Sequence, residues 1–160
     1  MSDPYTPPAA DLDTDILPME LAGRGTRFLA ALIDGIISAV LLGSVMAAFG
    51  IFDNIQNMGL VQTLTINLVG LVVFACVHGY LLKHYGQTVG KRVLGIKIVA
   101  LDGSLVDLPN LILKRYLPIT LCSAVPFVGP ILPLVDVLFI FSGERRCVHD
   151  HIAGTKVIKM

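Results

Sequence analysis

Two long apolar runs dominate the pattern of hydrophobic and polar positions along the chain. Residues 28–49 contain a single charged side chain, Asp34, and residues 60–82 contain none. A helix needs about 20 apolar residues to cross the hydrocarbon core of a bilayer. A soluble amphipathic helix does not stay apolar on every side over such a length. The pattern therefore predicts two transmembrane helices joined by a short polar connection at residues 50–59.

A third apolar region, residues 108–141, is broken by proline. The segment Pro-Phe-Val-Gly-Pro at residues 126–130 favours a break in the helix rather than a continuous span. The return arm, residues 131–141, is short for a full crossing. We therefore expect a helical hairpin with its tip near residues 126–130, either re-entrant or kinked. The chain would then make three to four passes.

The segment between the second and third apolar regions has a composition typical of β-structure. Residues 92–101 are rich in β-branched side chains, and the turn dipeptide Asp102-Gly103 follows them. We expect a small hairpin formed by residues 92–101 and 104–107, to which residues 154–159 add a third strand. Strand alternation would place three apolar side chains on one face: Leu94, Ile96 and Ile98.

Composition supports a bilayer as the surrounding solvent. Of the 160 residues 54% are apolar and 15% are charged, with a mean hydropathy of +0.77, whereas a soluble domain carries about 25% charged residues. These values indicate an all-α membrane bundle with a small β-hairpin, and they exclude a disordered chain or a disulfide-rich secreted module. Residues 1–20 are expected to form a disordered acidic tail, and residues 21–160 one transmembrane domain.

The positions of the basic residues predict the topology. Lys and Arg total 12, as do Asp and Glu, so no net charge attracts nucleic acid. Two basic residues precede the first run, none lies in residues 50–59, six follow the second run before residue 116, and four follow the third region. Basic residues in short loops mark the cytoplasmic side. We therefore expect a multi-pass protein of the cell membrane with both termini and the hairpin in the cytoplasm.

Asp34 is the most informative single residue, because a carboxylate inside a membrane helix costs several kcal/mol. Arg27 precedes it by seven residues and shares its helix face, but about 10 Å of helix separates them. Arg27 is therefore expected to reach a carboxylate on another helix or a lipid phosphate. Two interpretations of Asp34 stay open. It either handles protons or cations, or it forms a buried ionic link that fixes helix packing.

Two further polar residues lie at a similar depth. Asp136 is seven residues from the expected end of its helix, and His78 is five residues from Lys83. With Asp34 they could form one partly desolvated cluster with shifted pKa values, able to exchange a proton for a small cation. Alternatively, His78 caps a carbonyl group and Asp136 pairs with a basic residue. The candidate ion- or proton-binding residues are Arg27, Asp34, His78 and Asp136.

Other motifs argue against a metal centre, a nucleotide site or an enzyme. Residues 147–151 (Cys-Val-His-Asp-His) match no tetrahedral zinc spacing. Within them we expect Asp150 to cap a helix or to pair with Arg27 or Arg115. Residues 86–92 (Gly-Gln-Thr-Val-Gly-Lys-Arg) lack the spacing and the Ser or Thr of a phosphate loop. No hydrolase motif occurs, so we expect neither catalysis nor a cofactor.

Three blocks in order resemble the RDD family of small multi-pass membrane proteins. They are residues 27–34, which begin with arginine and end with aspartate, residues 86–99, and residues 149–155. The resemblance extends over residues 21–159. It implies that Arg27 and Asp34 are the first two residues for which the family is named, and that Asp150, in preference to Asp136, is the third. It also assigns a group of polar or structural motif positions: Gly86, Thr88, Gly90, Lys91, Arg92 and Gly95.

The resemblance also carries an expectation about function. Some members of the family are associated with sodium (or lithium, potassium)/proton antiport, which implies that activity for this chain. In that hypothesis Asp34 binds a proton or a cation, Arg27 tunes its charge state and Asp136 assists. The expected partners are the bilayer, small cations and protons, and further copies of the chain. The alternative is a non-transporting membrane assembly or lipid-interaction protein.

Overall fold

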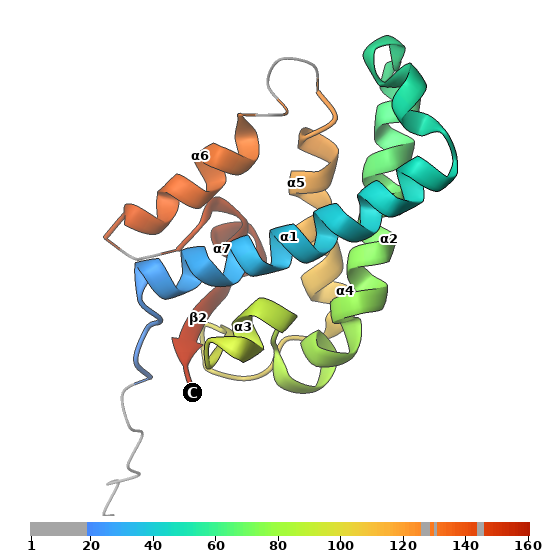
Figure 1. Ribbon diagram of the computed structural model, residues 1–160. Coiled ribbons are helices and arrows are strands. Elements are labelled where there is room, and N and C mark those ends of the chain that lie inside the picture. The colour runs from blue at the N-terminus through green and yellow to red at the C-terminus, as the bar shows by residue number, and fades with distance from the viewer. Residues whose placement is uncertain (1–18, 126–128, 130, 144–145) are drawn as a thin grey trace, which may run out of the picture.

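Two long helices form the frame of the protein. The structure is a computed structural model, and it describes residues 19–125, 129, 131–143 and 146–160. Helix α1 (Arg24–Ala48) leads through the 3-10 helix η1 (Ile51–Asn57) into helix α2 (Leu60–Tyr85) (Figure 1). Both long helices are long and apolar enough to cross a membrane, by length and composition. The prediction of two long apolar helices is confirmed.

The two long helices bury several charged or polar side chains and expose many large apolar ones. In α2 the buried residues are His78, Gly79 and Leu82, all in its last turns. In α1 the buried set includes two charged residues, Arg27 and Asp34. Large apolar side chains along both helices are exposed, among them Phe28, Ile36, Val40, Val61 and Val72. This arrangement is the one expected when lipid, rather than water, surrounds the helices.

The third apolar region forms two short helical arms. The outgoing arm consists of α4 (Leu108–Asn110), the π-helix η2 (Leu111–Tyr116) and α5 (Leu117–Cys122). The return arm consists of α6 (Leu132–Leu138) and the 3-10 helix η3 (Phe139–Phe141), and α5 contacts α6. The arms thus form a helical hairpin, as predicted. Part of its predicted tip, residues 126–128 and 130, lies outside the described residues.

Neither arm is long enough to span a bilayer on its own. The outgoing arm runs from Leu108 to Cys122, which gives about 22 Å at 1.5 Å per residue, against about 30 Å of hydrocarbon. The π-helix η2 was not predicted. Pro118 lies two residues after its end and has no N–H for the carbonyl of Lys114, which accounts for a local change from α-helical pairing.

The β-structure differs from the prediction. Strand β1 (Ile96–Ala100) pairs antiparallel with β2 (Thr155–Lys159), with Ile98 opposite Val157. The contribution of the C-terminal segment is therefore confirmed. The predicted hairpin with residues 104–107 is wrong, because those residues form no strand.

The sequence around the turn explains this difference. Asp102 accepts hydrogen bonds from both N and Oγ of Ser104, and Ala100 N donates to Ser104 O, so the turn itself forms. Helix α4 begins at Leu108, which leaves too few residues for a paired strand. Residues 92–95 of the predicted strand also belong elsewhere, since Arg92 lies in the short helix α3 (Val89–Val93).

A compact core lies where the sheet meets the start of α1 and the end of α2. Ile96, Ile98 and Val157 point from the sheet into this core, as alternation predicted for the first two. The short helix α7 (Val148–Ala153) leads directly into β2 (Figure 1). The chain also joins the sheet before α1, because Lys159 N donates to Glu20 O. Residues 1–18 of the predicted tail lie outside the described residues.

Candidate functional site

Asp34 is bound by a loop that is more than fifty residues away in sequence. Thr88 Oγ1 donates to Asp34 Oδ2 at 2.5 Å, and Gly90 N donates to Asp34 Oδ1 at 2.7 Å. Lys91 Nζ lies 3.9 Å from Asp34 Oδ2, and His78 Nδ1 lies 4.0 Å from Asp34 Oδ1. Asp34 is 7% exposed, so this is a buried carboxylate with two donors and two titratable neighbours.

The local sequence of α3 explains how it reaches Asp34. Thr88 is the N-cap of α3, and its side chain accepts a hydrogen bond from Lys91 N while its hydroxyl donates to Asp34. Gly90 permits close packing against α1, because a Cβ atom there would lie 2.3 Å from Ala30 O. Gly86, with φ of +66°, ends α2 in the left-handed conformation and turns the chain back toward α1.

His78 connects α2 to the same cluster. Its Nδ1 accepts a hydrogen bond from Val89 N at 3.2 Å, so the neutral ring carries its proton on Nε2. Nε2 is buried and has no hydrogen-bond partner among the described residues. His78 Nδ1 also lies 4.0 Å from Asp34 Oδ1, so the ring belongs to the same cluster. Among the described residues His78 accepts a backbone N–H and does not cap a carbonyl group.

Asp150 forms the second buried ionic group. It pairs with Arg27 from α1 and with Arg115 from the π-helix η2, and it also accepts a hydrogen bond from Cys147 N at 3.0 Å. The predicted cap and both predicted basic partners are thus present together. Arg115 Nη1 also donates to Thr155 Oγ1 at 2.6 Å, which links η2 to β2. This group ties four separate elements together at the base of α1.

Asp136 belongs to a third group and does not join Asp34. His149 N donates to Asp136 Oδ1 at 2.9 Å, and His149 Nδ1 lies 2.5 Å from Asp136 Oδ2. Within the described residues no hydrogen bond or ion pair joins Asp136 to Asp34 or to His78. The expected convergence is therefore present for Asp34 and His78 and absent for Asp136, which pairs with a histidine, as the alternative interpretation held.

Burial and neighbouring charges shift the pKa values of two side chains outside the long helices, Lys91 and Asp150. Burial and then the charge of Arg115 lower the pKa of Lys91 to about 8, against the opposing effect of Asp34. Burial opposes ionisation of Asp150, but the charges of Arg115, His149 and Arg27 hold its pKa well below the usual range. Lys91 is therefore a base that can lose its proton near neutral pH, whereas Asp150 stays ionised.

A small cavity lies between these groups. Its volume is about 60 Å³, and its polar lining comes from Arg27, Lys91, Arg115, Cys147 and His149. Such a polar space is large enough to hold a water molecule. The cavity therefore lies between Lys91 and the ionic group around Asp150.

The same region contains one set of side chains with metal-ligating chemistry. Ligand atoms of Asp136, Cys147 and His149 lie within 4.8 Å of one another. Two of them belong to the segment considered above for zinc, but the third partner is Asp136 and not His151. Arg27 Nη2 lies 3.7 Å from Cys147 Sγ, and burial raises the pKa of that thiol to about 11. A neighbouring guanidinium and a protonated thiol both oppose a divalent cation at this position.

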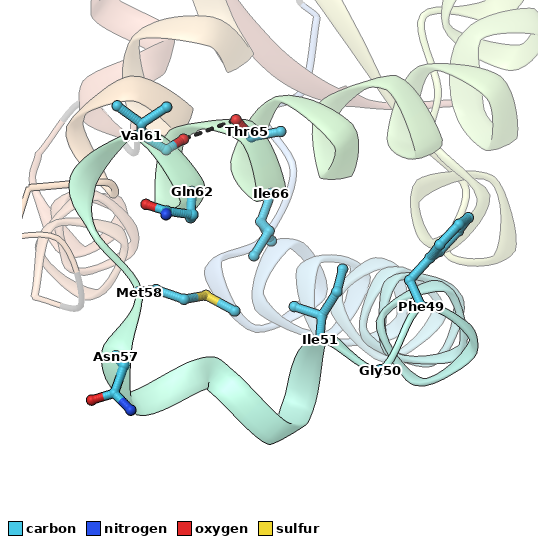
Figure 2. A pocket seen from close by; sticks show the side chains of 9 residues that line it. All are labelled: Phe49, Gly50, Ile51, Asn57, Met58, Val61, Gln62, Thr65 and Ile66. Carbon is cyan, nitrogen blue, oxygen red and sulfur yellow. Dashed lines mark hydrogen bonds between the residues drawn. The ribbon is translucent and has the colours of Figure 1, made fainter.

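Another cavity lies away from the ionic groups. Figure 2 shows it between the end of α1, η1 and the start of α2, with a volume of about 460 Å³. Ile51, Met58 and Ile66 point into it, and Thr65 Oγ1 donates to Val61 O and is thereby satisfied within its own helix. The side chains that line it include no charged group, so it offers no chemistry comparable to that around Asp34.

Two of the residues that matter most were not assigned to the ionic site from sequence. Lys91 and Thr88 were identified as motif positions, and the structure places both at Asp34. Arg115 was considered only as one of two partners for Asp150. In the sequence, Thr88 and Lys91 stand out only as members of the polar block 86–92, and Arg115 only as a basic residue in an apolar region. Neither feature specifies a contact partner. Arg92 and Gly95 do not contact Asp34; Gly95 has φ of +63° and turns the chain into β1.

Comparisons with known proteins relate the chain to one family. The model of the RDD family matches residues 21–154. The chain is 34% identical to Bacillus subtilis YckC, covering 85% of this chain and 83% of that protein, and 31% identical to Bacillus subtilis YxaI, covering 86% and 96%. It is 24% identical to the Bacillus subtilis protein named uncharacterized membrane protein YteJ, covering 91% and 85%. No solved structure gives a significant match.

Proposed function

The chain belongs to the RDD family, and from that premise we propose that this membrane protein exchanges protons for a small cation such as sodium at Asp34. The observation that carries the proposal is the geometry around this carboxylate. Two titratable side chains, Lys91 and His78, lie within 4.0 Å of its oxygens in a buried site. A carboxylate in such surroundings can hold either a protonated neighbour or a cation, and the choice depends on pH.

The exchange step follows from charge balance. With Lys91 protonated, its ammonium group neutralises Asp34. When Lys91 releases its proton, the carboxylate oxygens and Thr88 Oγ1 are available to a hard cation, which prefers oxygen ligands. One positive charge leaves as a proton and one enters with the cation, so the buried site stays neutral. The lowered pKa of Lys91, about 8, places this step near the pH of a cell.

Two residues have other roles in this proposal than the sequence suggested. Arg27 pairs with Asp150, so in this proposal it supports the site from the first turns of α1. Asp136 pairs with His149 and lies outside the exchange step. The distribution of basic residues along the chain supports an orientation with both termini in the cytoplasm. In that orientation Asp34 lies toward the cytoplasmic half of α1.

The exchange pathway is expected to require more than one copy of the chain. In the most apolar 18-residue stretch of α1 only 11% of residues are buried, and in that of α2 none is. Two such helices cannot by themselves shield an ion pathway from the surrounding lipid. Native mass spectrometry of the full chain extracted in non-ionic detergent is expected to detect dimers or larger assemblies. A strictly monomeric protein that still exchanges cations would contradict this part of the proposal.

Proton exchange is expected to fail when either Asp34 or Lys91 loses its ability to titrate. The measurement uses the purified chain in lipid vesicles with a pH-sensitive dye inside and sodium chloride added outside. Wild type is expected to move protons, faster as pH rises through about 8, because Lys91 must release its proton for the cation to bind. Asp34→Asn removes the charge, and Lys91→Arg keeps a charge that is not released. Both variants are expected to lose sodium-driven exchange.

Lys83→Gln is the matched control, because Lys83 is exposed at the end of α2 and does not contact Asp34. It is expected to retain wild-type exchange. Exchange that persists in Asp34→Asn, or a Lys91→Arg variant with an unchanged pH profile, would overturn the proposal.

A non-transporting assembly protein is the second candidate, and the ion pairs of Asp150 with two arginines favour it. In that case the buried charges serve to hold separate elements together. Thermal unfolding separates the two candidates. An Asp34→Asn variant that stays folded while exchange disappears supports transport. A wild-type protein without exchange, together with an Asp34→Asn variant that unfolds, supports assembly.

A further inference from the structure

A second cavity lies at the end of α2, apart from the ionic site. Its volume is about 440 Å³, and it is bordered by the last turn of α2, by α3 and by β1. Three basic side chains line it: His84, Arg92 and Lys97. None of the described residues that line it has a carboxylate side chain, so no acidic side chain among them balances the positive charge.

The three basic groups of this cavity form no ion pair with a carboxylate in the part of the chain that the structure describes. Arg92 instead lies over the ring of Tyr85, with Cζ 4.7 Å from the ring centroid. Lys97 lies in β1 between Ile96 and Ile98, which face the core, so alternation turns Lys97 to the opposite side. The positive charge is therefore available to a ligand.

The surroundings of the cavity are those of a membrane interface. Tyr80 and Tyr85 lie at the end of the apolar helix α2, and the ring of His84 lies 4.7 Å from that of Tyr80. Tyr80 is 67% exposed, and tyrosine at the end of a transmembrane helix is typical of the bilayer surface. Leu105, an exposed apolar side chain, lines the cavity and is suited to contact lipid.

We propose that this cavity binds the phosphate group of an anionic phospholipid, with Arg92 and Lys97 as the charged contacts and Tyr85 orienting Arg92. Charge complementarity selects an anion, and the adjoining apolar helix end with exposed tyrosines selects a lipid over a soluble ligand. Basic side chains next to a transmembrane helix attract anionic headgroups. This proposal stands independently of cation exchange.

The test titrates the purified full chain in non-ionic detergent with phosphatidylglycerol and, separately, with phosphatidylcholine. Lipid retention is followed by native mass spectrometry and stability by the thermal unfolding midpoint. Phosphatidylglycerol is expected to bind and raise the midpoint, whereas phosphatidylcholine is not. Arg92→Gln with Lys97→Gln is expected to weaken phosphatidylglycerol binding by about tenfold or more, and Lys97→Gln alone by a smaller factor.

The matched control removes two exposed charges elsewhere, Lys83→Gln with Lys114→Gln, and is expected to keep the affinity of wild type. Three results would overturn the proposal. The first is that the Arg92→Gln, Lys97→Gln variant binds phosphatidylglycerol as tightly as wild type. The second is that the control variant loses as much affinity as the Arg92→Gln, Lys97→Gln variant. The third is that inorganic phosphate alone raises the unfolding midpoint as much as the lipid does.

Discussion

Replacing Asp150 with asparagine is expected to lower the free energy of unfolding by about 3–5 kcal/mol, the cost of leaving a buried charge without its partner. Arg27 and Arg115 are 6% and 2% exposed, and both pair with this one carboxylate. Asparagine retains a hydrogen-bonding side chain but supplies no negative charge, so two guanidinium groups would remain buried with less compensation. Denaturant unfolding in detergent, followed by circular dichroism, measures the change.

The control for this variant is Asp53→Asn, because Asp53 is exposed in η1. Its effect is expected to stay within about 0.5 kcal/mol. Adding Arg115→Met to Asp150→Asn should recover part of the loss, since one uncompensated charge is removed. A loss below about 1 kcal/mol for Asp150→Asn would show that the buried pairs contribute little.

The pH dependence of this contribution has a definite sign. The folded-state pKa of Asp150 is lowered, so its contribution to stability is fully present above the unfolded-state pKa of about 4. That contribution is lost as pH falls through the lower value of the folded state. The ion pairs of Asp150 are therefore expected to persist in mildly acidic solution.

Features that depend on local pattern could be predicted from the sequence. The two long helices follow from uninterrupted apolar runs, and the proline-broken hairpin follows from residues 126–130 and their neighbours. The seven-residue spacing of Arg27 and Asp34 left two partners for Arg27, a carboxylate on another helix or a lipid phosphate, and the structure shows a carboxylate. That carboxylate belongs to Asp150, and the sequence analysis had suggested a pair between Asp150 and either Arg27 or Arg115.

Features that depend on contacts between distant segments could not be predicted in this way. The partner of β1 is β2, almost sixty residues later, and a turn dipeptide at residues 102–103 wrongly favoured a local strand. Thr88 and Lys91 reach Asp34 across more than fifty residues, and periodicity within either segment does not specify that contact. The site is therefore a product of tertiary packing, in which a glycine determines how closely α3 approaches α1.

Gly90→Ala is expected to disrupt both the fold near Asp34 and cation exchange. The added Cβ atom would lie 2.3 Å from Ala30 O and 3.1 Å from Asp34 Cγ, and Ala30 O is backbone that cannot rotate away. Helix α3 would have to move away from α1, which breaks the bond from Gly90 N to Asp34 and weakens the one from Thr88. We expect a loss of about 2–4 kcal/mol in the free energy of unfolding.

The matched control is Gly35→Ala in α1, next to Asp34, where an added Cβ atom meets nothing within 4 Å. It is expected to be neutral or slightly stabilising, because alanine favours the helix by about 1 kcal/mol over glycine. Sodium-driven proton movement in vesicles should therefore persist in Gly35→Ala and fall in Gly90→Ala to the level of Asp34→Asn. If Gly90→Ala keeps wild-type stability and exchange, the close contact of α3 with α1 is not what holds Asp34. The proposal that Lys91 releases its proton beside Asp34 would then be contradicted as well.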